Sequence, residues 1–441
     1  MAAWHRHFEA TLEVVDPELA ALVDGERRHQ ECRLEMVASE NYVSRAQLQV
    51  SGSVLGNTTV EGYPGARFLK ASAHVDAIER LAIRRACELF GARHANVQPH
   101  SGSQANQAVF LALLQPGDTV LSMSLAAGGH FSHGAPSNLS GLWFRTVHYG
   151  LDADGGIDYA QALQLALAER PKLVIAGASA WPRTIDFGRL AAIARAVDAR
   201  LMVDIAHVAG LVASGLFPDP FPHADVVTTT TGKNLRGVRG GLVLCNDAAL
   251  AARIDAAVSP GLQGTPLVHL VTAKAVAFLE ALQPDFRAYN VQVLANARAL
   301  AAALQRRGVP IMTGGTDTPF VIADLRPLGL DGATATKCLD RVHIGVNPAP
   351  LPGDGDDFAR ASGLRLGVSA LTTRGLCEAD LDEVADIVVR ALRAHDAAGV
   401  VAAASAGVIA GIAVDESVDR RLKREVLALC GRFPLYPAPT G

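Results

Sequence analysis

The sequence lacks paired cysteines and an excess of charge of one sign, and we expect no targeting signal. Its six cysteines stand singly along 441 residues, with no CxxC pair and no density typical of a disulfide scaffold. We therefore expect a reducing, cytoplasmic environment. The formal net charge is −4 with both signs dispersed, so the composition predicts neither a nucleic acid nor a membrane as a partner.

Membrane segments are also missing. The first residues include acidic side chains where a signal peptide needs a basic region and an apolar run, so no export is expected. The apolar segment 398–412 is about 15 residues long, short of the roughly 20 that span a bilayer. We expect this segment to pack within the protein.

What remains is the composition of a large globular α/β protein. Hydrophobic residues make up 49% of the chain and charged residues 19%, and the length predicts two or three domains. Apolar residues recur at helical spacing over residues 75–90, 190–197, 267–282 and 289–307. Short β-rich runs between helices cover residues 118–122, 173–176, 201–203, 226–229 and 241–245.

Strands that alternate with helices predict a mostly parallel sheet, with the ligand at the carboxyl ends of its strands. After the helix near 289–307 the elements become shorter, at 319–325, 364–368 and 381–394. We expect an N-terminal arm over residues 1–45, a large domain over 46–290 and a smaller α+β domain over 291–441.

A carboxylate and a lysine follow two of the predicted strands. Asp204 comes directly after the strand 201–203, and Lys233 follows four threonines and a glycine. A pyridoxal-phosphate enzyme needs such a pair, because the lysine binds the cofactor as a Schiff base and the carboxylate keeps the pyridine nitrogen protonated. Alone, Asp204 could be a helix cap and Lys233 a surface lysine. Together, at the edge of the sheet where ligands bind, they favour a cofactor site.

Small polar residues open an apolar helix after Gln98. Backbone N–H groups at the helix N-terminus, with the hydroxyls of Ser101 and Ser103 on either side of Gly102, would form a phosphate cradle. The segment has no Walker lysine, which disfavours a nucleoside triphosphate. A plain serine-capped helix is the alternative interpretation.

A third motif is Gly-Gly-His130-Phe-Ser-His133. A histidine after two flexible glycines can lie flat on the face of an aromatic cofactor. The two histidines could also be metal ligands, but no nearby cysteine or paired carboxylate completes a ligand set. We therefore expect no metal and assign His130 to the cofactor face.

These motifs resemble serine hydroxymethyltransferases, which are pyridoxal-phosphate enzymes of fold type I, the aspartate aminotransferase-like fold. The resemblance runs from about residue 15 to 435 and implies a large domain with a mostly parallel sheet of the seven-stranded type. It rests on Ala38-Ser39-Glu-Asn41, Glu61-Gly-Tyr-Pro-Gly65, the segments around Ser101 and His130, Asp204-Ile-Ala-His207, Thr-Thr-Thr-Thr-Gly-Lys233, Gln263-Gly264 and Ser362-Gly-Leu-Arg365-Leu-Gly.

The resemblance also implies the cofactor contacts. Lys233 would be the Schiff-base lysine, Asp204 the partner of the ring nitrogen and His130 the stacked ring. The remaining contacts implied are Ser101, Gly102 and Ser103 at the phosphate, Gly264 and its neighbour Thr265 from a second subunit, and Ser179 and His207 at the phenolic oxygen.

On the substrate side, the resemblance assigns the amino-acid carboxylate to Ser39 and Arg365. A planar guanidinium can hold a carboxylate through two parallel hydrogen bonds. Glu61, contributed by the neighbouring subunit, would handle the proton of the substrate hydroxyl. Shared sites imply a homodimer, with a tetramer as the alternative.

The chain departs from the family's usual pattern beside the expected site. The departures are Thr59 for a tyrosine, Phe68-Leu69 for a tyrosine pair, Gly232 for a histidine, Thr265 for a glycine and Ala349 for an asparagine. Loss of a tyrosine hydroxyl and an asparagine amide removes hydrogen-bond partners of a folate ring, which leaves tetrahydrofolate open as the one-carbon carrier. Thr59 and Leu69 are smaller than the aromatic residues and leave space for an α-methyl group on the substrate.

These departures predict the reversible cleavage of α-methylserine to alanine and formaldehyde, with a pyridoxal-phosphate cofactor and possible independence of folate. A quaternary Cα has no α-proton, so cleavage of the Cα–Cβ bond is the natural first step. Alternatives are a tetrahydrofolate-dependent serine hydroxymethyltransferase and a threonine-type aldolase or transaldolase. A catalytically inactive family member with a binding role belongs to a different class, and the intact Lys233, Asp204 and Arg365 argue against it.

Overall fold

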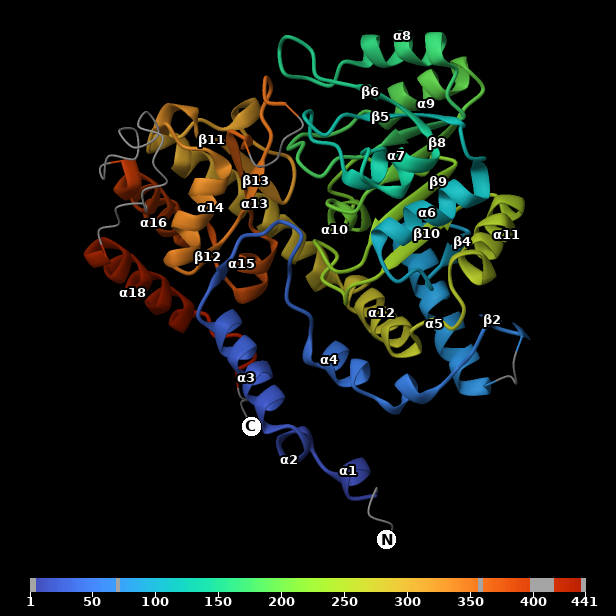
Figure 1. The fold of residues 1–441 in the computed structure, drawn as a ribbon, viewed down its shortest axis with the longest axis horizontal. Helices are drawn as coiled ribbons and strands as arrows, with labels where there is room; N and C mark the ends of the chain where they lie inside the picture. Colours follow the sequence, from blue (N-terminus) through green and yellow to red (C-terminus); the bar gives the residue numbers. More distant parts are fainter. Residues whose placement is uncertain (1–4, 69–71, 356–359, 397–415, 438–441) are drawn as a thin grey trace.

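The computed structural model describes residues 5–68, 72–355, 360–396 and 416–437. Its larger part is built on a seven-stranded sheet with the strand order β4-β10-β9-β8-β7-β5-β6 (Figure 1). The strands are β4 (His94–Asn96), β5 (Thr119–Met123), β6 (Arg145–Tyr149), β7 (Leu173–Ala176), β8 (Arg200–Asp204), β9 (Val226–Thr230) and β10 (Gly241–Cys245). Strands β9, β8, β7, β5 and β6 are parallel, whereas β10 runs antiparallel to both of its neighbours.

Helices enclose this sheet, as parallel sheets require. The inner strands β7 and β10 are buried along their whole length, which explains their continuous apolar sequences. The helices of this part are α5 (Ala73–Phe90), α6 (Gly102–Leu113), α7 (Leu139–Trp143), α8 (Tyr159–Glu169), α9 (Phe187–Ala196), α10 (Ala209–Ala213), α11 (Ala248–Ala256) and α12 (Val268–Ala281). The predicted mostly parallel α/β fold is confirmed.

A second, three-stranded antiparallel sheet lies in the smaller part of the protein, at the left in Figure 1. It contains β11 (Phe320–Asp324), β14 (Gly363–Gly367) and β13 (Asn347–Ala349), with α14 (Gly332–Arg341), α15 (Ser369–Arg374), α16 (Glu378–Asp396) and α18 (Glu416–Arg432) around it. The α+β character of this region was expected from its shorter elements.

The long helix α13 (Pro284–Arg306) joins the two parts and packs against α12 and α16. It begins at a proline, which suits the first turn of a helix because that turn needs no N–H donor there. The predicted helix began at residue 289, five residues too late. Residue 290 lies inside α13, and the division at residues 45 and 290 stays a prediction.

The N-terminal segment extends away from the body of the protein (Figure 1). It consists of α1 (His5–Glu9), α2 (Leu12–Val15) and α3 (Pro17–Glu31), followed by β1 (Leu34–Glu35), which pairs with β12 (Ile344–Gly345). Helix α3 has no buried side chain. The segment therefore exposes large apolar side chains, namely Phe8, Leu12, Val14, Val15, Leu19, Leu22 and Val23.

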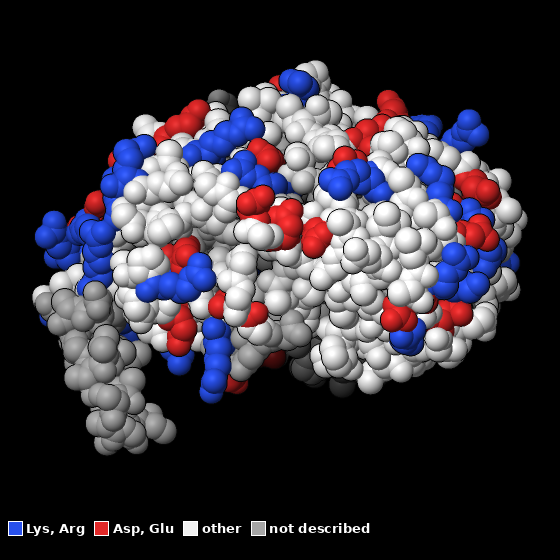
Figure 2. All heavy atoms as spheres, turned by 90° about the horizontal axis from the view of Figure 1, so that it is seen from above, with Lys and Arg blue, Asp and Glu red and all other residues white. Residues whose placement is uncertain are grey.

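Beyond this segment, α4 (Arg45–Ser51) leads to a short hairpin of β2 (Gly62–Tyr63) and β3 (Ala66–Arg67). Leu69 and the apolar segment 398–412 lie outside the described residues. Within the described part of the chain, no helix has both the length and the apolar character to cross a membrane. On the face shown in Figure 2, Lys and Arg side chains are interspersed with Asp and Glu.

Candidate active site

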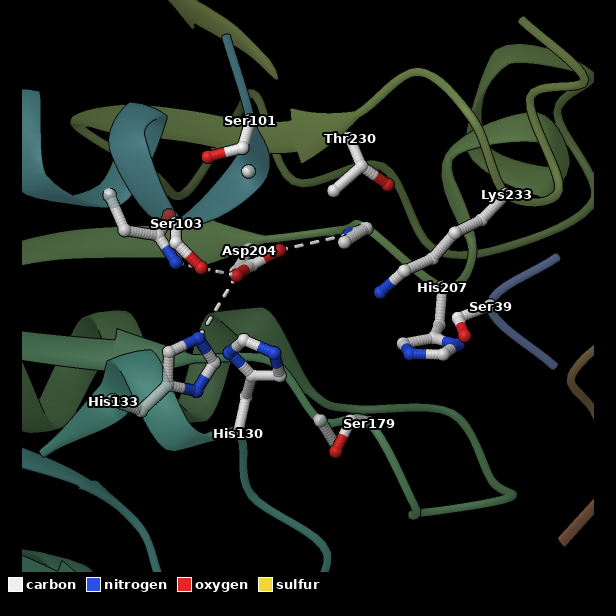
Figure 3. Close-up of a pocket in the computed structure, with 14 residues that line it drawn as sticks. Ser39, Ser101, Ser103, His130, His133, Ser179, Asp204, His207, Thr230 and Lys233 are labelled. Atoms are coloured by element: carbon white, nitrogen blue, oxygen red, sulfur yellow. Dashed lines mark hydrogen bonds and ion pairs between the residues drawn. The ribbon is translucent and has the colours of Figure 1, made fainter. Parts of the chain in front are cut away.

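A cavity of about 250 Å³ lies at the carboxyl ends of the parallel strands (Figure 3). The motifs of His130, Asp204 and Lys233 reach it from different loops, because β5, β8 and β9 all end at this edge. The cavity is lined by Ser39, Ser101, Gly102, Ser103, Asn106, His130, His133, Ala178, Ser179, Asp204, Ala206, His207, Thr230 and Lys233.

Lys233 enters the cavity from the loop between β9 and β10, and its amine points between His207 and Asp204 (Figure 3). Burial lowers the pKa of Lys233 to about 8. The negative charge of Asp204 opposes this shift, and the guanidinium charge of Arg365 adds to it. A larger share of the amine is therefore neutral, and able to attack a carbonyl group, than in an exposed lysine.

Asp204 stands at the end of β8 and is held by three hydrogen bonds. Its Oδ2 accepts from Asn106 Nδ2 at 2.9 Å and from His133 Nε2 at 3.0 Å, and its Oδ1 accepts from the Ala206 N–H at 3.0 Å. Burial alone would raise the pKa of Asp204, but the hydrogen bond with His133 and the nearby imidazoles hold it below the ordinary value. The carboxylate therefore stays ionised and can pair with a protonated ring nitrogen.

His130 is a neutral ring. Burial lowers the pKa of His130 to about 3, and the neighbouring imidazole of His133 adds to the shift. Its Nδ1 accepts from the Ser132 N–H at 3.2 Å and lies 2.7 Å from Ser132 Oγ. A neutral imidazole with a fixed orientation can stack on an aromatic ring without adding a positive charge to the cavity.

The N-terminus of α6 forms another wall of the cavity. Ser101 caps the helix, because its Oγ accepts from the Gln104 N–H at 3.1 Å. Gly102 is needed for close packing, since a Cβ at this position would clash with the side chain of Thr230. The Oγ1 of Thr230 is buried without a partner in the described structure. A phosphate at the helix N-terminus would find backbone donors and this hydroxyl.

Arg365, on β14, does not line the cavity but contacts Ser179, which does. Its Nη1 donates to the Ser179 carbonyl at 2.5 Å and its Nη2 to Asn347 Oδ1 at 3.3 Å, while Nε is buried without a partner. Burial lowers the pKa of Arg365 to about 10. Among the described residues no carboxylate forms an ion pair with it, and a partly buried guanidinium with an unpaired Nε can bind a carboxylate ligand.

Several predicted site residues do not line the cavity. Glu61 and Gly264 lie side by side, because a Cβ built on Gly264 would sit 3.1 Å from Glu61 Oε1. Thr59 is exposed and Thr265 is partly buried, and neither lines the cavity. Ser39 and His207 do line it, as expected from the motifs.

The remaining departures from the family pattern have different surroundings. Ala349 is 1% exposed and belongs to the main hydrophobic core, so its methyl group faces packed side chains. Gly232 is buried, and a Cβ there would meet the backbone and side chain of Arg239 at 3.3 Å.

The sequence motifs did not predict that Asn106 and Thr230 line the cavity, nor that His133 contacts Asp204. Asn106 follows Ser103 by three residues on a helix, a spacing that places both on one face and could have identified it. His133 had been considered only as a metal ligand, whereas its Nε2 bonds to Asp204. Its partner comes from 71 residues further along the chain, so no local pattern could have shown it.

The cavity thus offers what pyridoxal phosphate needs: a buried amine, an ionised carboxylate, a neutral stacking ring and a phosphate cradle. These groups, on a seven-stranded mostly parallel sheet, define the class of fold-type I pyridoxal-phosphate enzymes.

Sequence comparison gives the family within that class. The family model described as serine hydroxymethyltransferase matches residues 12–388. The chain is 51% identical over 429 residues to "Serine hydroxymethyltransferase" of Prochlorococcus marinus (strain MIT 9303), covering 97% of each chain. It is 51% identical over 433 residues to the protein of the same name from Caulobacter sp. (strain K31), covering 97% of this chain and 96% of that one. The chain belongs to the serine hydroxymethyltransferase family, and it is a pyridoxal-phosphate-dependent enzyme of hydroxymethyl transfer.

Proposed function

We propose that the enzyme transfers a hydroxymethyl group between serine and tetrahydrofolate, as a serine hydroxymethyltransferase. The observation that carries this proposal is the partly buried Arg365, which has no acidic partner among the described residues and contacts the wall of the cavity that contains Lys233. This arrangement suits the carboxylate of an amino acid. The names of the relatives support serine as the substrate better than α-methylserine, which the sequence departures had favoured.

Pyridoxal phosphate, when bound, supplies an electron-accepting ring that stabilises negative charge on the substrate Cα. Lys233 would hold its aldehyde carbon, and Asp204 would keep a proton at its ring nitrogen. His130 would cover one face of the ring and exclude water there. Arg365 would fix the substrate carboxylate and so set which bond at Cα is aligned for cleavage.

Glu61 is proposed to move the proton of the substrate hydroxyl in the site of a neighbouring subunit. Its position outside the cavity of its own chain, next to Gly264, supports a shared site. The exposed large apolar side chains of α1 to α3 also support a second copy as the partner, because exposed apolar side chains that gather on one segment often mark a protein–protein contact. We therefore propose a homodimer with shared active sites.

The substrate proposal is tested with serine, α-methylserine and threonine, each with and without tetrahydrofolate. We expect serine to be converted rapidly only when tetrahydrofolate is present. Formation of formaldehyde and alanine from α-methylserine at a higher kcat/KM than any serine reaction would refute the proposal.

Cleavage of α-methylserine to formaldehyde and alanine is a second candidate function. It is favoured by Thr59, which is smaller than the tyrosine usual in the family and lies near Glu61 in sequence. If Thr59 comes next to the substrate together with Glu61, the Thr59→Tyr variant should lose activity toward α-methylserine and keep activity toward serine.

The shared site is tested with mixed dimers of a Glu61→Ala chain and a Lys233→Ala chain. Each homodimer should be inactive. The mixed dimer should regain activity, because one site then combines the lysine of the first chain with the glutamate of the second. An inactive mixed dimer, with proven mixing, would place Glu61 in the site of its own chain.

A further inference from the structure

Three hydrogen bonds hold the backbone carbonyls of Glu61 and Gly62. The Phe68 N–H donates to the Glu61 carbonyl at 2.9 Å, which closes the β2–β3 hairpin. The next carbonyl, that of Gly62, accepts from Arg67 Nη1 at 2.6 Å and from Gln98 Nε2 at 3.0 Å. Two side chains from different segments therefore converge on the peptide group between Gly62 and Tyr63, one residue beyond Glu61.

Glu79, on α5, holds both of these side chains. Its Oε2 accepts from Arg67 Nη2 at 2.6 Å, and its Oε1 accepts from Gln98 Nε2 at 2.7 Å. All three groups are inaccessible to water, since Glu79 is 2% exposed, Gln98 is 1% exposed and the side chain of Arg67 is 1% exposed. Buried hydrogen bonds that involve charged groups are stronger than exposed ones and fix geometry closely.

Gln98 also connects this cluster to other parts of the site. It lies three residues before Ser101, in the segment that leads to the phosphate cradle. Its carbonyl accepts from Gln263 Nε2 at 3.3 Å, directly beside Gly264. The two segments expected to serve the neighbouring subunit are thus attached to each other and to the cradle of their own chain.

We propose that Glu79 is a positioning residue for Glu61, acting through Arg67 and Gln98 on the Gly62 carbonyl. This inference rests on the proton-transfer role proposed for Glu61. Glu79 touches no part of the cavity, so its effect on the reaction passes through the hairpin that carries Glu61.

The chemistry of the side chain explains why a carboxylate is needed. Glu79 accepts one hydrogen bond on each oxygen, from two donors that approach from different sides. A glutamine at this position has the same shape but only one carbonyl oxygen, and its amide group would face one of the two donors. The carbonyl oxygen of that glutamine should stay with the charged Arg67, whose Nε also donates to Asp76 Oδ1 at 2.9 Å. The Glu79→Gln variant should therefore release Gln98 from its place.

A double-mutant cycle tests the proposal, with Glu61→Gln, Glu79→Gln and the double variant, all at saturating cofactor. We expect Glu79→Gln to lower kcat for serine by about tenfold or more with little change in KM, because a displaced catalytic group costs rate rather than binding. In the Glu61→Gln background the same substitution should have almost no further effect. Additive losses would mean that Glu79 only supports the fold, and would overturn the proposal.

A second measurement does not depend on activity. Hydrogen exchange in the cofactor-free Glu79→Gln protein should accelerate at the Phe68 amide, whose bond to the Glu61 carbonyl closes the hairpin. Unchanged exchange there would also overturn the proposal. Glu88→Gln, an exposed glutamate on the same helix, serves as the matched control and should leave both readouts unchanged.

If Glu79→Gln does not fold, Gln98→Met replaces it in the same cycle. It removes the second donor to the Gly62 carbonyl and leaves both ion pairs of Arg67, with Asp76 and Glu79, intact. The mixed-dimer experiment tests the shared site separately from the positioning role of Glu79. An inactive mixed dimer refutes the shared site, whereas an additive cycle refutes only the positioning role of Glu79.

Discussion

The environment of Lys233 predicts how fast the cofactor-free enzyme captures pyridoxal phosphate at different pH values. With a pKa of about 8, ~10% of the amine is neutral at pH 7, whereas ~0.03% would be neutral at the ordinary pKa of about 10.5. The neutral fraction is thus about 300-fold larger at pH 7 than for an exposed lysine. Covalent capture should accelerate steeply up to about pH 8 and level off above it.

The perturbation that tests the cause is Asp204→Asn. The negative charge of Asp204 raises the pKa of Lys233 against the effect of burial, so its removal should move the midpoint to lower pH. The midpoint can be measured without cofactor, by isotope-labelled reductive methylation and NMR titration, with Lys233→Ala identifying the signal. A midpoint at pH 10 or above in the parent protein would refute the reasoning, because the amine would then behave as if exposed.

Three further predictions concern other parts of the site. Lys274 is buried, donates to three backbone carbonyls and has a pKa lowered to about 7 by burial, so Lys274→Met should lower the free energy of unfolding by about 2–4 kcal/mol. Above pH 7 the amine of Lys274 holds a proton less often in the folded parent than in the unfolded chain, so the stability of the parent rises with pH. The Lys274→Met variant lacks this contribution. The difference between the two free energies of unfolding, measured by urea denaturation, should therefore be larger at about pH 9 than at pH 7. Gly102→Ala should weaken cofactor binding in equilibrium titrations by at least about tenfold, because its Cβ would clash with Thr230 and displace the start of α6. Arg365→Lys should raise KM for the amino acid about a hundredfold, since a lysine cannot form two parallel hydrogen bonds to a carboxylate; an unchanged KM would show that the carboxylate binds elsewhere.

Local sequence signals predicted the central strands of the fold well. Strands β7 and β10 match the predicted ranges, because their continuous apolar runs reflect burial on both faces. The edge strand β6 was missed, since most of its side chains are partly or fully exposed and polar residues interrupt the pattern. The three-residue strand β4 is too short to show any period.

The site could be predicted where its residues belong to contiguous motifs. Lys233, Asp204, His130 and Ser101 line one cavity because their loops leave the same edge of the sheet, which the alternation of strands and helices implies. The contact between His133 and Asp204 depends on how two loops pack, and no sequence period encodes it.

The antiparallel strand β10 gives the loop of Lys233 a short path. Thr230 at the end of β9 pairs directly with Gly241 at the start of β10, so the intervening ten residues leave the sheet and return to the adjacent strand. Inside the loop, the Thr231 N–H donates to the Gly240 carbonyl at 3.1 Å and the Gly237 N–H to the Thr231 carbonyl at 2.7 Å. The entropic cost of closing this loop is met during folding. Binding or release of pyridoxal phosphate should therefore require little rearrangement of the backbone around the Lys233 amine.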